Sequence, residues 1–134
     1  MAAPFLATCS IYDWNFFNIG RDMNTMTLLS AALCEASQTV MKKTDNKCGF
    51  IVKIIPFIPS LLLASFFIFA HFLSLYICSF DIEAFCNAHF KVKLGDQTDY
   101  FASIVRNDAE KYNIDISHFN KVMDKYHSSI KKSE

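Results

Sequence analysis

The sequence is poor in glycine and proline, with three residues of each. Long flexible linkers are rich in these residues, so their scarcity argues against disordered connections between domains. The chain also has no excess of either charge, because thirteen Lys and Arg balance thirteen Asp and Glu. Proteins that bind nucleic acid mainly by neutralising phosphates carry a basic excess, and we therefore expect no nucleic-acid partner.

Sequence signatures of catalysis and of cofactor binding are also missing. The chain has no nucleophile elbow, phosphate-binding glycine loop or zinc-protease motif. None of the spacings between its five cysteines is that of a C-x-x-C or zinc-finger motif. Cys86 and His89 form a C-x-x-H pair, which supplies only two of the four ligands of a structural zinc ion. We therefore expect no catalytic residue, no metal, no cofactor and no enzymatic activity.

The most informative absence is that of charge between Lys53 and Asp81. A helix from Pro59 to Phe80 would be about 33 Å long at a rise of ~1.5 Å per residue, and the hydrocarbon core of a bilayer is roughly 30 Å thick. Leucine, isoleucine and phenylalanine lie on all sides of this helix, which is typical of a membrane span. A chain of 134 residues has little other protein with which to surround such a helix. The segment therefore predicts a single transmembrane helix.

The predicted fold class is mainly α, with a single transmembrane helix flanked by an N-terminal amphipathic helix and a C-terminal two-helix module. Four segments follow from the composition along the chain. They are an aromatic segment at 1–20 that could lie at a membrane interface, an amphipathic helix and polar turn at 21–48, the transmembrane span at 49–80 with its helix at about 59–80, and a polar module with a helical hairpin at 81–134.

An amphipathic helix is predicted over residues 22–42. Its apolar side chains recur at intervals of three and four residues, as the turn of an α-helix requires. They are Met26, Leu29, Leu33, Ala36 and Val40. Basic residues in the last turn complement the negative end of the helix dipole.

The C-terminal module begins with a stretch of alternating apolar and basic residues, Phe90–Leu94, which predicts a short strand. A helix is predicted over 97–112, although Asp108 interrupts its apolar face. A second helix follows, capped by Asp115 or Ser117. The apolar faces of these two helices predict a helical hairpin.

The predicted span carries one stripe of small and polar residues. Its members are four or three residues apart, so they lie within about 80° of one another at ~100° per residue. They are Ser60, Ala64, Phe67, His71, Ser74 and Cys78. Helices in bilayers associate through small residues and interhelical hydrogen bonds, and this face is therefore predicted to contact other transmembrane helices.

His71 is the only ionisable side chain of basic or acidic type in the predicted transmembrane helix at about 59–80. An ionisable group at that depth is costly and usually faces protein or water. It could relay protons or ligate a metal. The simpler interpretation, which we favour, is a neutral imidazole that donates a hydrogen bond to a Ser hydroxyl or a carbonyl.

These features predict a non-catalytic accessory or assembly subunit of a larger membrane complex. Its expected partners are the lipid bilayer and other transmembrane helices, with a hetero-complex favoured over a homo-oligomer. One alternative is a membrane-active oligomer of the holin-like, viroporin-like or immunity type. The other is a soluble all-α interaction module that uses the apolar segment as its core.

The basic residues predict an integral membrane protein with its N-terminus on the cytoplasmic side, or the matrix side if mitochondrial. Positive charges near a span tend to remain on the side where insertion begins. Four lysines precede the span closely and two follow it, namely Lys42, Lys43, Lys47 and Lys53 before it and Lys91 and Lys93 after it.

Overall fold

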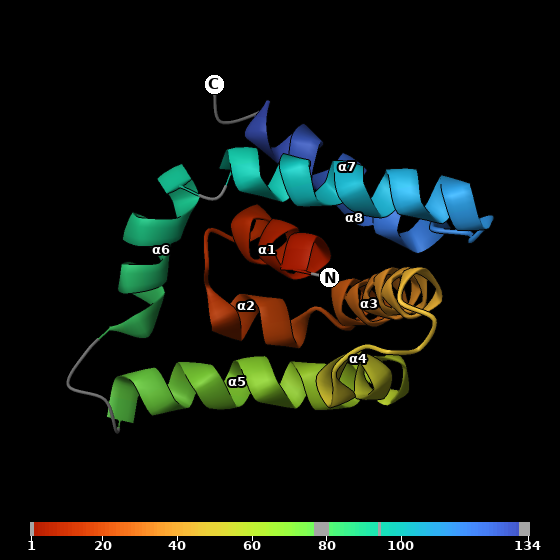
Figure 1. Cartoon of the computed structure of the whole chain (residues 1–134). Helices are drawn as coiled ribbons and strands as arrows, with labels where there is room; N and C mark the ends of the chain where they lie inside the picture. Colours follow the sequence, from red (N-terminus) through yellow and green to blue (C-terminus); the bar gives the residue numbers. More distant parts are fainter. Residues whose placement is uncertain (1, 77–80, 94, 132–134) are drawn as a thin grey trace.

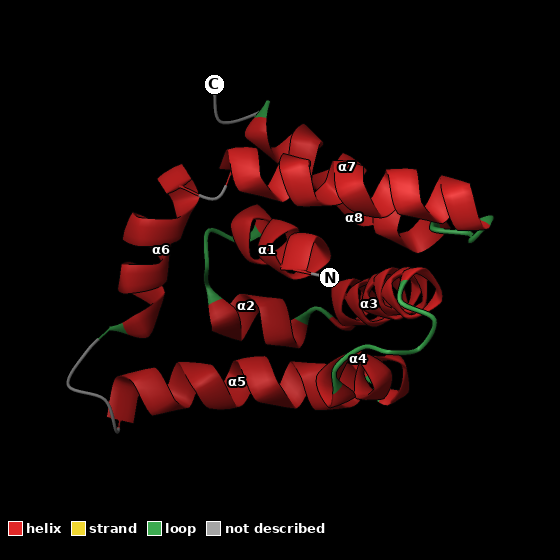
Figure 2. Ribbon diagram, in the orientation of Figure 1, coloured by secondary structure: helices red, strands yellow, loops and turns green. Residues whose placement is uncertain are grey.

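The chain is described by a computed structural model that covers residues 2–76, 81–93 and 95–131. Within these residues it consists of helices and short turns, without a strand (Figure 2). The elements are α1 (Ala2–Ile11), α2 (Phe16–Arg21), α3 (Met23–Lys43), α4 (Phe50–Ile54), the 3-10 helix η1 (Ile55–Phe57), α5 (Ser60–Tyr76), α6 (Ile82–Lys93), α7 (Gly95–Tyr112) and α8 (Ser117–Ile130). The mainly α prediction is confirmed.

The helices are arranged around α1 and α3 (Figure 1). Helices α7 and α8 pack on one side of these two helices, and α2 and α5 lie on the other. Helix α4 and η1 pack against α3, and α6 runs along one edge between the end of α5 and the start of α7. The two C-terminal helices were predicted to pack on each other as a hairpin, but each of them packs mainly against α1 and α3.

The core contains two clusters of buried apolar side chains, and both draw on α1 and α3. The first cluster joins α1, α3, α7 and α8 through Ala3, Ala7, Ala32, Ala36, Ala102, Val105, Phe119, Val122, Met123 and Tyr126. The second joins α1, α2, α3 and α5 through Cys9, Trp14, Phe16, Ile19, Met26, Leu29, Leu33, Ala64 and Phe67. Residues of the aromatic N-terminal segment are thus part of the protein core.

Three helices are followed by an Asp or Asn in the left-handed conformation that glycine more often supplies at the end of a helix. Asp13, Asp45 and Asn113 follow α1, α3 and α7 and have φ angles of 49°, 51° and 52°. In each case the amide of the next residue donates to the carbonyl five residues earlier, at 2.8 to 2.9 Å. This is the Schellman arrangement, which needs a left-handed residue, and Asn and Asp adopt that conformation more readily than other non-glycine residues.

Gly20 serves close helix packing instead. A Cβ atom at this position would lie 2.9 Å from the carbonyl oxygen of Ala64 and 2.7 Å from Cγ1 of Ile68. Only glycine therefore allows α2 and α5 to approach this closely. The contact fixes which side of α5 faces the protein.

Helices α7 and α8 are attached to α3 by two charged contacts. Asp108, which interrupts the apolar face of α7, accepts a hydrogen bond from Lys43 Nζ at 2.7 Å. The carboxylate of Glu35 accepts from the backbone amides of His118 and Phe119, at 3.1 and 2.8 Å, and caps the N-terminus of α8. The predicted local cap by Asp115 or Ser117 is wrong, because the N-cap residue of α8 is Ile116, which makes no side-chain cap bond. Asp115, one residue earlier, does accept a hydrogen bond from the Ser117 amide at 3.0 Å.

The chain bends sharply between α4 and α5, and serines on α3 hold the bend. Pro56 has no amide hydrogen, so the carbonyl of Val52 lacks its helical donor. Ser37 Oγ donates to this carbonyl at 2.5 Å, and Ser30 Oγ donates to the carbonyl of Ile58 at 2.8 Å. Both hydroxyls replace donors within a helix break, so the bend leaves no carbonyl unsatisfied at these two positions.

The structure does not support the predicted single transmembrane helix. In the described part of the chain, no single helix is long and apolar enough to cross a membrane. Phe50–Phe57 and Ser60–Tyr76 meet the length and composition criteria only together, and they are bent by 110°. The physical reason is the break at Pro56 and Pro59, together with burial of one side of α5. The predicted helix end at Phe80 lies outside the described residues.

The predicted strand at Phe90–Leu94 is also wrong, because residues 90–93 continue α6. Five alternating residues are too few to separate the period of a strand from that of a helix. A strand would also need a partner, and the described residues provide none. Leu94 lies outside the described residues.

Candidate functional site

The predicted stripe of α5 faces the protein itself. Ala64, Phe67 and Ser74 are buried, while Ser60 and His71 are half-buried. Cys78 lies outside the described residues. These side chains lie on the side of α5 that packs against α2 and α3, where the ring of Phe67 stacks on Phe5 with centroids 5.5 Å apart and contacts Phe16 at 5.9 Å. The structure therefore brings the stripe together with helices of the same chain.

His71 lies among aromatic rings at the edge of the α2–α5 contact. Its ring centroid is 5.2 Å from that of Phe17 and 5.6 Å from that of Phe72. The guanidinium of Arg21 lies over the Phe17 ring, 5.3 Å from its centroid. No group of three His, Cys, Asp or Glu side chains within the described residues is placed to hold a metal ion.

The opposite side of α5 is apolar and exposed to solvent. Leu61 is 68% exposed, Phe69 62% and Tyr76 78%. Helix α4 and η1 continue this surface, since Phe50 and Phe57 are 75% and 82% exposed. We call this surface the apolar face, and it consists of Phe50, Ile51, Ile54, Phe57, Leu61, Leu62, Phe66, Phe69, Phe72, Leu75 and Tyr76. In Figure 1 it belongs to the lowest layer of the fold, formed by α4 and α5.

The apolar face is large for a small protein. Aromatic side chains present about 150–250 Å² each, so eleven large side chains that are about two-fifths to four-fifths exposed leave on the order of 1,000 Å² uncovered. Monomeric proteins rarely expose contiguous apolar patches above roughly 300–600 Å². A patch of this size indicates a surface that is covered by something else when the protein acts.

The apolar face offers very few polar groups. Between Lys47 and Asp81 the only charged residue is Lys53, which is exposed on α4. Ser65 is exposed on α5, and its hydroxyl donates to the Leu61 carbonyl at 2.9 Å within the same helix. The surface therefore has almost no donor or acceptor directed at a binding partner.

A hollow of about 610 Å³ lies beside the apolar face, between α3 and the α4–η1 segment. On one side it is lined by Cys34, Gln38 and Met41, and on the other by Asn46, Lys53, Pro56 and Phe57. Its volume is in the range of small-molecule pockets. Its walls combine apolar side chains, two amides and one ammonium group.

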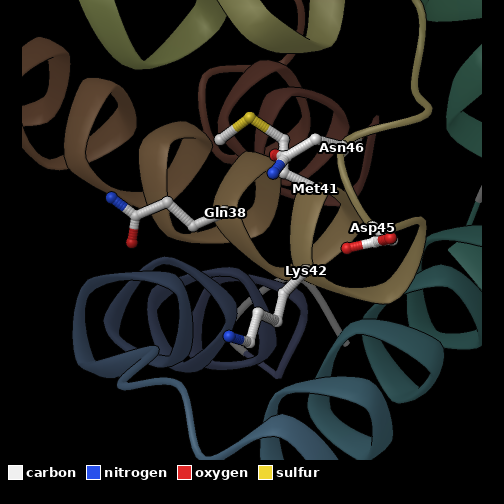
Figure 3. Close-up of a pocket in the computed structure, with 5 residues that line it drawn as sticks. All are labelled: Gln38, Met41, Lys42, Asp45 and Asn46. Carbon is white, nitrogen blue, oxygen red and sulfur yellow. The ribbon is translucent and has the colours of Figure 1, made fainter.

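A second hollow of about 300 Å³ shares Gln38, Met41 and Asn46 with the first. Lys42 and Asp45 complete its lining. In Figure 3 the Lys42 side chain extends away from Met41 and Asn46. The two hollows thus form neighbouring parts of one depression, which is more polar at the end of α3 and more apolar toward η1.

The carboxylate of Asp22 connects several polar groups as a helix cap. Asp22 accepts hydrogen bonds from the Tyr12 hydroxyl and from the amide and hydroxyl of Thr25, the latter two at 3.1 and 2.9 Å. The Tyr12 hydroxyl and the Thr25 amide hold the pKa of Asp22 below its ordinary value. Burial raises the pKa of Tyr12. A carboxylate held ionised by these donors caps α3 and is a poor general base.

The thiols of Cys9 and Cys34 are also poor nucleophiles. Burial, followed by the neighbouring Cys86, raises the pKa of the Cys9 thiol. Burial and the nearby Glu35 raise the pKa of Cys34, which lines the larger hollow. Reactive cysteines have lowered pKa values, so neither thiol has the pKa of a reactive cysteine. Cys9 is buried and Cys34 is half-buried.

Comparison with protein-family models, curated proteins and solved structures yields no match to this chain. The class of protein is therefore defined by the fold alone, as an α-helical protein with an exposed apolar face. Sequence reasoning missed this face because α5 is apolar on all sides. The one sequence signal for it is the pair of small residues Gly20 and Ala64, which marks the side of α5 that a second helix approaches.

Proposed function

We propose that the chain is a small non-catalytic membrane protein that inserts its apolar face into one leaflet of a bilayer. The observation that carries this proposal is the roughly 1,000 Å² of exposed apolar surface on α4, η1 and α5. Helices with such a surface lie in the plane of the membrane, with their apolar side about 5–10 Å below the headgroups. The bent α4–α5 pair is suited to this position, because it lies along one side of the protein (Figure 1).

The chemistry of the face favours lipid over a protein partner. Protein interfaces have about one hydrogen bond per 100–200 Å² and a polar rim. Here the one exposed hydroxyl, that of Ser65, is bonded within its own helix. Each fully inserted Leu or Phe contributes about 1.5–3 kcal/mol, so a few of them suffice for stable attachment.

The accessory-subunit hypothesis stays part of the proposal. The helical body would lie on the cytoplasmic or matrix side, because basic residues close to an inserted segment tend to remain on that side of the membrane. We propose for the chain a structural role in a larger complex and not a catalytic one. Blue-native electrophoresis after mild detergent extraction tests this role, and migration as a monomer alone would contradict it.

Vesicle flotation tests the insertion itself. The variant Leu62→Glu/Phe69→Glu places two charges on the apolar face, and the matched control Tyr100→Glu/Phe101→Glu places two on exposed aromatic positions of α7. We expect the wild type and the control to float with vesicles, and the first variant to bind at least ten-fold more weakly.

Other outcomes identify the alternatives. Equal flotation of both variants, or a wild type that stays in the aqueous fraction, would overturn the proposal. A stable dimer in buffer that is lost in the Leu62→Glu/Phe69→Glu variant would assign the face to a second copy instead. Release of a dye trapped in the vesicles would favour the membrane-active oligomer.

A further inference from the structure

We propose that the larger hollow between α3 and the α4–η1 segment binds the headgroup of one anionic lipid. The inference rests on the proposed insertion of the apolar face. To that proposal it adds a binding site in the hollow, an anionic lipid as the ligand, and Lys53 as the residue that selects an anionic headgroup. Lys53 would pair with the phosphate, and the apolar wall would receive the first part of an acyl chain.

The hollow is continuous with the apolar face. Phe57 lines the hollow and is also 82% exposed on the face, and Lys53 lies in α4 between the exposed Ile51 and Ile54. A lipid whose chains lie beside the inserted face would therefore have its headgroup at the mouth of the hollow. Lysine suits this depth, because its stem lies along apolar surface while its ammonium group remains at the headgroup level.

The lining is complementary to an anion. Lys53 is the only charged side chain among the residues that line the larger hollow, and no carboxylate lines it. The carboxylate of Asp45 lines the smaller hollow. Gln38 and Asn46 supply amide groups, which donate to phosphate oxygens. Of these, Gln38 Nε2 now makes only a weak contact to Cys34 Sγ at 3.4 Å.

The rest of the lining favours a lipid over a free phosphate. The apolar wall of the hollow consists of Met41 on the α3 side and of Pro56 and Phe57 on the η1 side, and an inorganic ion makes no favourable contact with it. The volume of about 610 Å³ is also far larger than a single phosphate needs. A headgroup joined to an acyl chain uses both the ammonium group and this wall.

Binding to two kinds of vesicle tests the inference. We compare vesicles of phosphatidylcholine alone with vesicles of equal parts phosphatidylcholine and phosphatidylglycerol. The variant is Lys53→Ala, and the control is Lys121→Ala, which removes an exposed lysine from α8. We expect the wild type to bind the anionic vesicles more tightly than the neutral ones. The ratio of the two affinities should fall about five-fold in Lys53→Ala and change little in the control.

A soluble lipid tests the site directly. Titration with dihexanoyl phosphatidylglycerol should shift the Met41 methyl and Asn46 side-chain amide resonances of the wild type, and much less those of Lys53→Ala. Equal shifts with glycerol phosphate at the same concentration would mean that the hollow takes a free phosphate ester, which overturns the lipid assignment.

The two proposals fail differently. Equal binding of the wild type to both kinds of vesicle, or equal losses in Lys53→Ala and Lys121→Ala, would overturn the headgroup site and leave the insertion of the apolar face intact. A wild type that binds neither kind of vesicle would overturn both.

Discussion

Small residues decide how the helices approach one another, and Gly20 is the clearest case. An added methyl group would meet the Ala64 carbonyl oxygen at 2.9 Å, and a backbone atom cannot move away alone. Alanine normally stabilises a helix by about 0.5–1 kcal/mol relative to glycine. At this position the helix propensity of alanine would therefore raise the free energy of unfolding, whereas the steric clash would lower it. The clash should dominate, because it forces α2 and α5 apart.

We therefore expect Gly20→Ala to lower the free energy of unfolding by about 1–3 kcal/mol, the usual cost of overpacking. Urea denaturation measures this change. Gly49→Ala is the matched control, because no atom lies within 4 Å of its added Cβ and its φ of −61° suits alanine. The control should be neutral or slightly more stable. Equal effects at the two glycines would show that close packing at Gly20 is unimportant.

A second prediction at this scale concerns acid stability. The Tyr12 hydroxyl and the Thr25 amide lower the pKa of Asp22 in the folded protein, whereas an unfolded Asp has a pKa of about 3.9. A group with a lowered folded pKa stabilises the fold above its unfolded pKa, and this contribution is lost as the pH falls through the folded pKa. The affected window therefore lies below about pH 4.

Tyr12→Phe removes the largest cause of the shift, so its folded pKa for Asp22 should move back toward the ordinary value. We expect its free energy of unfolding to fall less steeply than that of the wild type below about pH 4. Urea denaturation at several pH values measures the slope. Tyr100→Phe, at an exposed tyrosine on α7, is the control and should follow the wild type. Parallel curves for all three proteins would contradict this account.

At the scale of elements, the predicted helices formed where apolar residues recur with the helical period. The helix predicted over 22–42 is α3, and that predicted over 97–112 is α7, with bounds that differ by no more than two residues. Asp108 interrupts the apolar periodicity of α7. It lies there because it pairs with Lys43, which belongs to another helix. No local sequence feature predicts such a pair.

The shape of the apolar segment at 49–80 is harder to predict than its composition. Mean hydropathy does not register the two prolines or the hydrogen bonds from another helix that bend the segment. Pro56 and Pro59 divide it, and Ser30 and Ser37 stabilise the break from a helix far earlier in the chain. Ala64, Phe67 and Ser74 of the predicted stripe are buried where α5 packs against α2 and α3. The sequence alone does not show that the helices packed on α5 belong to the same chain. It also does not show which side of α5 is exposed, because α5 is apolar on all sides.

The bend between α4 and α5 should depend on the hydroxyl of Ser37. Ser37 is fully buried, and its hydroxyl is the donor to the Val52 carbonyl that Pro56 leaves without a helical partner. Ser37→Ala should therefore lower the free energy of unfolding by about 1–3 kcal/mol, the cost of an unsatisfied buried group. Ser65→Ala is the control, because its exposed hydroxyl bonds to a carbonyl of its own helix. It should change stability by less than about 0.5 kcal/mol.

Thermal unfolding followed by circular dichroism measures both serine variants. A loss in Ser37→Ala no larger than that in Ser65→Ala would mean that water satisfies the Val52 carbonyl. In that case the serine would not hold the bend between α4 and α5.

At the scale of the whole molecule, stability and the proposed membrane contact are carried by different surfaces. The two core clusters lie among α1, α2, α3, α7, α8 and the inner side of α5. The apolar face is the outer side of α5 with α4 and η1, and it adds little to either cluster. Substitutions on the face should therefore change vesicle binding without unfolding the helical body.

The two clusters themselves should unfold together, because α1 and α3 contribute side chains to both. Helix α1 supplies Ala3 and Ala7 to the first cluster and Cys9 to the second, so neither cluster can open without exposing a helix that the other needs. Single domains below about 150 residues usually unfold in one cooperative step. Trp14, the only tryptophan, is 4% exposed within the second cluster and reports on its unfolding.

We therefore predict that Met123→Ala, a change in the first cluster, shifts the fluorescence transition of Trp14 in the second. Met123 is fully buried on α8, and such a truncation costs about 2–5 kcal/mol. Urea curves followed by Trp14 fluorescence and by far-UV circular dichroism should coincide in the wild type and move by the same amount in the variant. A fluorescence transition that stays in place while the circular dichroism transition moves would show that the clusters unfold independently, and that α1 and α3 do not couple them.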